Sequence, residues 1–90
     1  MSHTKAEKAK LLDRVRRVRG QIEAVERALV EEKGCSVVLH RIVAARGAIN
    51  GLMTEVIEDH IRLHVVKPAK DSERNRGAEE LIEAVQSYLR

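Results

Sequence analysis

The fold is decided by residues 35–66, which read CSVVLHRIVAARGAINGLMTEVIEDHIRLHVV. No proline interrupts the stretch from Val37 to His64, and apolar residues recur along it at helical spacing. The pattern predicts one long helix over about residues 36–66, with Pro68 as its natural stop. The apolar residues that recur at this spacing are Val38, Ile42, Ala45, Ile49, Leu52 and Val56.

This helix keeps the candidate ligands of one chain apart. Cys35 lies at its start and His60 and His64 lie near its end, so a rise of ~1.5 Å per residue separates the thiol from the imidazoles by roughly 37–43 Å. An antiparallel copy of the same helix brings them together. Small residues near the expected crossing point, from Ala44 to Gly51, allow two helix backbones to approach closely. The sequence therefore predicts a dimer whose ligand site lies at the subunit interface.

Two further helices flank the central one. The first is expected over about residues 5–32, with Thr4 and Glu7 forming a capping box at its start and Lys33-Gly34 following its end. Residues 67–77 are polar and read as a linker, and a third helix is expected over about residues 77–89. The apolar stripe of the first helix comprises Leu11, Val15, Val18, Ile22, Val25 and Leu29; that of the third comprises Ala78, Leu81, Ile82, Val85, Tyr88 and Leu89.

Composition limits what the chain can be. Its 90 residues make one all-α domain, 43% apolar, with Tyr88 as the only aromatic residue and Cys35 as the only cysteine. The first two helices should form a hairpin, and two hairpins should form an antiparallel four-helix bundle dimer. The N-terminus shows no signal peptide, and no stretch reaches the ~18 apolar residues of a membrane span. We expect a cytoplasmic homo-oligomer without a membrane partner.

Positive charge is concentrated in the first half of the first helix. From Lys5 to Arg19 there are seven basic residues and two acidic ones, whereas the formal net charge of the whole chain is only +3. A twofold dimer would present this patch twice, a surface suited to the phosphates of duplex DNA. A solvated helix face is the alternative interpretation. The candidate DNA contacts are Lys8, Lys10, Arg14, Arg16, Arg17, Arg19 and Arg46.

His60 and His64 are spaced i, i+4, so their rings project from one side of a helix and can share a metal ion. Cys35 of the partner adds a thiolate, and His3 is the natural fourth ligand. Such a set suits Ni(II), Co(II) or copper, and Zn(II) fits it in vitro. Two surface histidines are the plainer interpretation. Glu55 is expected at the surface.

The chain resembles the small all-helical bacterial repressors that sense copper, nickel/cobalt or formaldehyde, the CsoR/RcnR/FrmR group. The resemblance covers essentially the whole chain. It implies a dimer of dimers, a tetramer that binds operator DNA and releases it when effector occupies a Cys-His interface site. Arg14 and Arg17 match positions that this family uses against DNA. The stretches that carry the resemblance are RVRRVRGQ (14–21), Cys35, ARGAINGLM (45–53), EDH (58–60) and SYLR (87–90).

The resemblance leaves two effectors open. Nickel/cobalt sensors carry His, Cys, His and His where this chain has His3, Cys35, His60 and His64, which implies Ni(II) or Co(II). Copper sensors carry a second Cys at the place of His64, and a site with one thiolate is too hard to favour Cu(I). In formaldehyde sensors a thiolate and the N-terminal amine condense with formaldehyde, and Ser2 and Cys35 could react in that way without any metal.

Two other classes of function are weighed against a repressor. A metal-storage bundle would use the same ligands without touching DNA. An enzyme is not expected, because the sequence shows no set of nucleophile, base and orienting residue, and Cys35 with His60 reads better as ligands than as a catalytic dyad.

Overall fold

The structure is a computed structural model that describes residues 4–88. These residues form α1 (Lys5–Val30), α2 (Cys35–Ile61), the π-helix η1 (Arg62–Val66) and α3 (Asp71–Tyr88). No strand occurs in this part of the chain, which confirms the predicted all-α protomer with three helices. The chain divides into two compact units, and the boundary between them falls inside α2, after Thr54.

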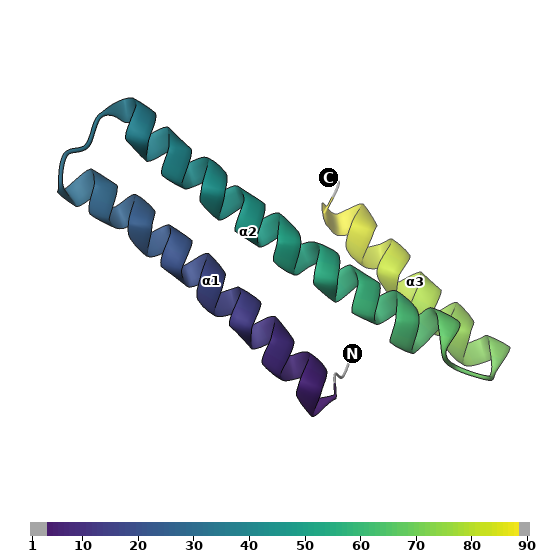
Figure 1. Ribbon diagram of the computed structural model, residues 1–90. Coiled ribbons are helices and arrows are strands. Elements are labelled where there is room, and N and C mark those ends of the chain that lie inside the picture. Colours follow the sequence, from purple (N-terminus) through teal and green to yellow (C-terminus); the bar gives the residue numbers. More distant parts are fainter. Residues whose placement is uncertain (1–3, 89–90) are drawn as a thin grey trace. The chain divides into compact units, whose positions relative to one another are not determined.

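The first unit is a helical hairpin of α1 and the first part of α2, which run antiparallel (Figure 1). The predicted capping box opens α1. Glu7 N–H donates to Thr4 Oγ1 at 3.2 Å, and Thr4 N–H donates to Glu7 Oε2 at 2.8 Å. Two N–H groups that would otherwise lack a helical partner are thereby satisfied, which defines where α1 begins.

The end of α1 differs from the prediction. The helix stops at Val30, and Glu32 takes the left-handed conformation with φ 54°. Lys33 N–H then donates to Ala28 O and Glu32 N–H to Leu29 O, which is the Schellman pattern. We expected Gly34 to follow the helix end in this role. Instead its carbonyl accepts the first N–H bonds of α2, from Val37 and Val38.

Small residues lie at the centre of this packing. Ala28 in α1 and Ala45 in α2 are each 4% exposed and are the only buried apolar residues in the described part of the chain. At the closed end of the hairpin, a cavity of about 60 Å³ is lined by both helices, including Ala24 and Ala28 of α1 and Val37 and Arg41 of α2. One chain therefore has very little hydrophobic core of its own.

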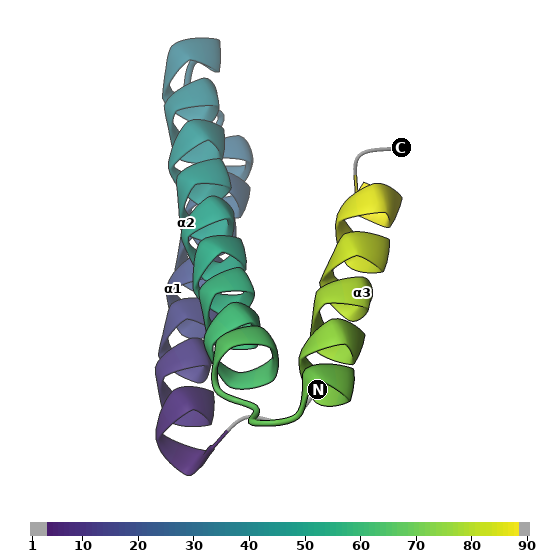
Figure 2. The same ribbon diagram turned by 90° about the vertical axis from the view of Figure 1, so that its right-hand side faces the viewer.

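The second unit comprises the last turns of α2, η1 and α3, and the chain turns back after η1 (Figure 2). Here the predicted linker is too long, because α3 begins at Asp71 and not near Gly77. Asp71 and Glu73 occupy the first turn, where the helix dipole favours acidic side chains. Gly77, predicted to end the linker, lies inside α3 and is buried.

The reason for Gly77 is a close approach to the π-helix. A Cβ atom at this position would lie 2.0 Å from the carbonyl oxygen of His64. Pro68 has no N–H to donate to that same carbonyl, four residues earlier, so regular helix cannot continue past η1. Lys67 N–H instead donates to Arg62 O at 3.0 Å, the bond that closes the wider π-turn. The expected helix over residues 36–66 therefore ends as five residues of π-helix.

Within residues 4–88, no helix is both long enough and apolar enough to cross a membrane.

Candidate metal centre and basic face

The structure brings the predicted histidine pair together. His60 lies in the last turn of α2 and His64 lies in η1. Their ring centroids are 5.0 Å apart, with 36° between the ring planes. Both imidazoles therefore occupy one site, although His64 reaches it from a π-turn and not from a regular helix.

His60 is held in place by α3. Its side chain is 4% exposed, and Nε2 lies 2.7 Å from the carbonyl oxygen of Gly77. A carbonyl oxygen only accepts, so Nε2 carries the proton and donates. In the neutral ring, the lone pair then lies on Nδ1. In metal sites, a hydrogen bond from the ring nitrogen that does not bind the metal orients the histidine and fixes its tautomer.

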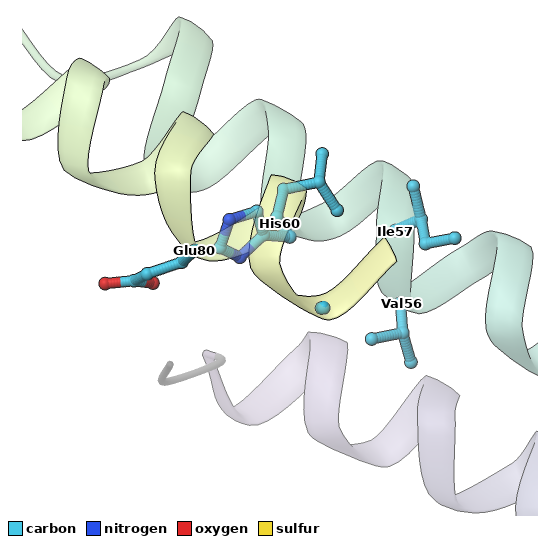
Figure 3. Close-up of a pocket in the computed structure, with 6 residues that line it drawn as sticks. Val56, Ile57, His60 and Glu80 are labelled. Atoms are coloured by element: carbon cyan, nitrogen blue, oxygen red, sulfur yellow. The ribbon is translucent and has the colours of Figure 1, made fainter. Parts of the chain in front are cut away.

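A cavity of about 150 Å³ lies beside His60, between the end of α2 and α3 (Figure 3). Its walls are mainly aliphatic. Glu80 stands at its edge, and its carboxylate points away from the His60 ring (Figure 3). The remaining lining residues are Val56, Ile57, Leu81 and Ala84.

Two buried polar atoms of residues near His60 in sequence have no hydrogen-bond partner. They are His64 Nε2 and Asp59 Oδ2. Such atoms are rare in native proteins and often mark a place where an ion or water completes the structure. An imidazole nitrogen is a ligand that Ni(II), Co(II) and Zn(II) all accept. The donor chemistry of the histidine pair therefore fits a metal ion.

The other predicted ligands are not assembled here. Cys35 is exposed at the first residue of α2. Ser2 and His3 lie outside the described residues. Across residues 4–88, no group of three or more His, Cys, Asp or Glu side chains comes close enough together to hold a metal ion. The four-ligand site over His3, Cys35, His60 and His64 thus stays a prediction.

The basic face of α1 is mostly exposed to solvent. Lys8, Lys10, Arg17 and Arg19 are exposed, as is Arg46 on α2. Arg16 is exposed too, and its Nη1 lies 2.8 Å from Asp13 Oδ1. Both side chains of that pair are well exposed, so the pair contributes little to stability.

Arg14 differs from the other basic residues of this segment. It is half-buried, and its Nη1 lies 3.0 Å from the point where a Cβ of Gly51 would stand. Its guanidinium therefore rests on α2 of the same hairpin, at a position where the helix has no side chain.

Sequence reasoning missed two residues of this region. Glu55, expected at the surface, is 8% exposed. Gly77 looked like the end of a linker, although its carbonyl holds His60. The signal that could have indicated the burial of Glu55 is its position three residues after Leu52, a spacing that shares a helix face with that stripe. Nothing local to Gly77 signals its role, because the contact arises only when α3 folds back.

Comparison with known proteins gives concordant results. Residues 7–87 match the family described as metal-sensitive transcriptional repressors. The chain is 47% identical over 91 residues to a Serratia marcescens protein described as an uncharacterized protein in the bioA 5′ region. It is 39% identical over 90 residues to the transcriptional repressor RcnR of Citrobacter koseri. In both pairs, 100% of each chain is covered.

A solved structure shares the fold. It is a variant of the formaldehyde-responsive regulator FrmR from Salmonella enterica serovar Typhimurium, with a TM-score of 0.85 and 40% sequence identity. The match covers 97% of this chain and 99% of the other.

Proposed function

The chain belongs to the family of metal-sensitive transcriptional repressors, and on that basis we propose that it binds duplex operator DNA and releases it on binding Ni(II) or Co(II). The observation that carries the choice of effector is the histidine pair. His64 Nε2 is buried without a partner, beside a His60 ring whose Nε2 is already occupied by Gly77 O. Two imidazoles prepared in this way suit a divalent metal of the nickel and cobalt type.

The proposed site is completed by a second chain. His60 and His64 of one chain would bind together with Cys35 of its partner, which an antiparallel pair of α2 helices would bring to the same end, and with His3. Such a ligand set supplies one thiolate and several nitrogens, which favours Ni(II) or Co(II) over Cu(I). Exposed Cys35 is available for such a contact between chains.

The proposed DNA surface is the basic half of α1. Lys8, Lys10, Arg16, Arg17 and Arg19 are exposed there and Arg14 is half-buried beside them, with Arg46 on α2 as a further contact. A homodimer presents this surface twice and a homotetramer four times. Each Lys or Arg that meets a phosphate releases a bound counterion, so affinity should fall steeply with salt.

Effector and DNA binding would be coupled through α1. Ligation of His3 ties the segment before Thr4 to Cys35 of one chain and to the histidine pair of another. That constraint changes the position of α1, which carries the DNA contacts. A tenfold change in operator affinity requires only ~1.4 kcal/mol of coupling.

The alternative effector is formaldehyde, favoured by one observation: the thiol of Cys35 is exposed. The thiol sulfur would add to the carbonyl carbon of formaldehyde, and the amine of Ser2, once Met1 is removed, would displace the resulting hydroxyl as water. The product is a methylene bridge between sulfur and nitrogen, formed without metal. FrmR, described as formaldehyde-responsive, shares this fold.

The test is fluorescence anisotropy of the metal-free protein on DNA from its own promoter, titrated in parallel with Ni(II), Co(II) and formaldehyde. Release by metal alone supports the histidine site. Release by formaldehyde under metal-free conditions makes Cys35 and the N-terminal amine the sensor. No binding to duplex DNA at any salt concentration would leave the metal-storage bundle as the better interpretation.

A further inference from the structure

The guanidinium of Arg14 in α1 lies against Gly51 in α2. A basic helix face that only meets solvent or DNA would not require this contact. Among the seven basic residues from Lys5 to Arg19, Arg14 alone is not exposed. Its Nη1 lies 3.0 Å from the position of an absent Cβ at Gly51. Both residues belong to the same compact unit, so the contact is internal to one hairpin.

Gly51 is not needed here for backbone reasons. No glycine in the described chain has a positive φ, and Gly51 lies in the interior of α2, where glycine destabilises a helix relative to alanine. What glycine supplies at this position is space. A Cβ would be in tighter contact with the guanidinium than nearly all Cβ atoms tolerate, and a longer side chain would occupy the place where the guanidinium lies.

We propose that Gly51 is a positioning residue for Arg14: the gap it leaves in α2 holds the Arg14 guanidinium in the orientation used for DNA. This inference rests on the proposed DNA-binding function and deepens it. A side chain already held against α2 loses less conformational freedom when it meets a phosphate than a freely moving arginine does. Gly51 itself makes no contact with DNA in this account.

Gly47 provides a matched control. It lies one turn earlier in α2, it is exposed, and no atom lies within 4 Å of where its Cβ would be. Alanine at either position improves helix propensity equally and keeps the side chain small at the expected crossing of two chains. Only at Gly51 does the new side chain meet Arg14.

The experiment is a double-mutant cycle on operator affinity, measured by anisotropy on the full metal-free protein. Gly51→Leu should weaken binding about two- to tenfold, the range expected when one long side chain loses its ordered position. Gly47→Ala, matched to Gly51→Ala, should leave affinity within about twofold, because alanine keeps a small side chain at the expected crossing of two chains. In an Arg14→Ala background, Gly51→Leu should have no further effect. Sedimentation of each variant confirms that the oligomer is unchanged.

Gly51→Ala serves the same cycle if the leucine variant does not assemble, because alanine shifts the guanidinium by only a few tenths of an ångström and should cause a smaller, still non-additive loss. Equal losses with and without Arg14, or no loss at all, overturn the inference. Arg17→Ala separates a failure of the proposed Gly51 role from a failure of the proposed DNA-binding function. If Arg17→Ala weakens binding and the cycle is additive, only the role of Gly51 fails. If the wild-type protein does not bind DNA, the role of Gly51 fails together with the proposed function.

Discussion

At two glycines of this protein, Gly51 and Gly77, another part of the chain lies close to the position that a Cβ atom would occupy. At Gly51 it is the guanidinium of Arg14, the end of a flexible side chain that can move. At Gly77 it is the backbone of His64, which cannot move without disturbing η1. Substitution of glycine by a larger residue should therefore be tolerated better at Gly51 than at Gly77, and unfolding measurements can test this.

Gly77→Ala should destabilise the protein by about 1–3 kcal/mol, the usual cost of overpacking, because the new methyl group collides with the His64 carbonyl. Urea unfolding at fixed protein concentration measures this. Gly20→Ala is the control, since no atom lies within 4 Å of a Cβ there and alanine should stabilise α1 by ~0.5–1 kcal/mol. Equal effects of the two substitutions would contradict the close packing of α3 on η1.

Cys35→Ala should leave operator binding intact and abolish release by Ni(II), Co(II) and formaldehyde alike. The thiol is exposed, so its removal costs little folding energy. His64→Ala separates the effectors, because it should abolish the response to metal only. Anisotropy titrations of both variants against wild type give the answer, and a Cys35→Ala variant that still responds to either effector would contradict both sensing mechanisms.

At the scale of the element, the basic residues of α1 are concentrated in its half from Lys5 to Arg19. Arg17→Ala, in the basic half, should weaken DNA binding and lower the slope of log affinity against log salt by ~1 for each protomer in contact. Arg27→Ala, in the last turn of the same helix, should change neither quantity. The measurement is a salt series from about 50 to 200 mM. Equal effects at the two positions would mean that the basic half is not the DNA surface.

The end of α1 is strained at one residue. Glu32 has φ 54°, a conformation that costs a side chain of this type about 1–2 kcal/mol and glycine almost nothing. Glu32→Gly should therefore stabilise the fold by about 0.5–1 kcal/mol after the greater freedom of glycine in the unfolded chain is subtracted. Glu31→Gly, where φ is −82°, should give no gain. Thermal unfolding of the two variants distinguishes them.

At the scale of the whole molecule, apolar surface is left uncovered. None of the side chains in residues 4–88 is fully buried, and several large apolar residues of α2 are about half exposed. Leu39 is 55% exposed, Val43 53% and Ile42 46%. A single chain with so little core is a poor candidate for an independent fold, and membership of this repressor family implies oligomerisation.

Val43→Glu should place a charge on this uncovered face and shift the protein toward a smaller, less stable species. Gln86→Glu adds the same charge at an exposed polar position of α3 and should change nothing. Sedimentation equilibrium reports mass, and the melting temperature of the wild type should rise with protein concentration if folding and assembly are linked. A Val43→Glu variant with unchanged mass and stability would show that this face is not an interface.

Much of the protein follows from local sequence. Apolar spacing and Pro68 predict the long central helix. Thr4 and Glu7 predict the capping box at the start of α1. The spacing of His60 and His64 predicts that their rings are adjacent. All of these depend on contacts within a few residues, so the pattern alone is enough. The family too was recognisable from short stretches such as RVRRVRGQ and ARGAINGLM.

The tertiary structure decided what depends on residues distant in sequence. Gly77 meets His64 and holds His60 only because α3 turns back onto η1, and nothing in the flanking sequence distinguishes this glycine from a loop glycine. Gly51 faces Arg14 because two helices of one hairpin lie in a particular register. Periodicity predicts which face of a helix is apolar, but close contacts depend on how two backbones are placed against each other.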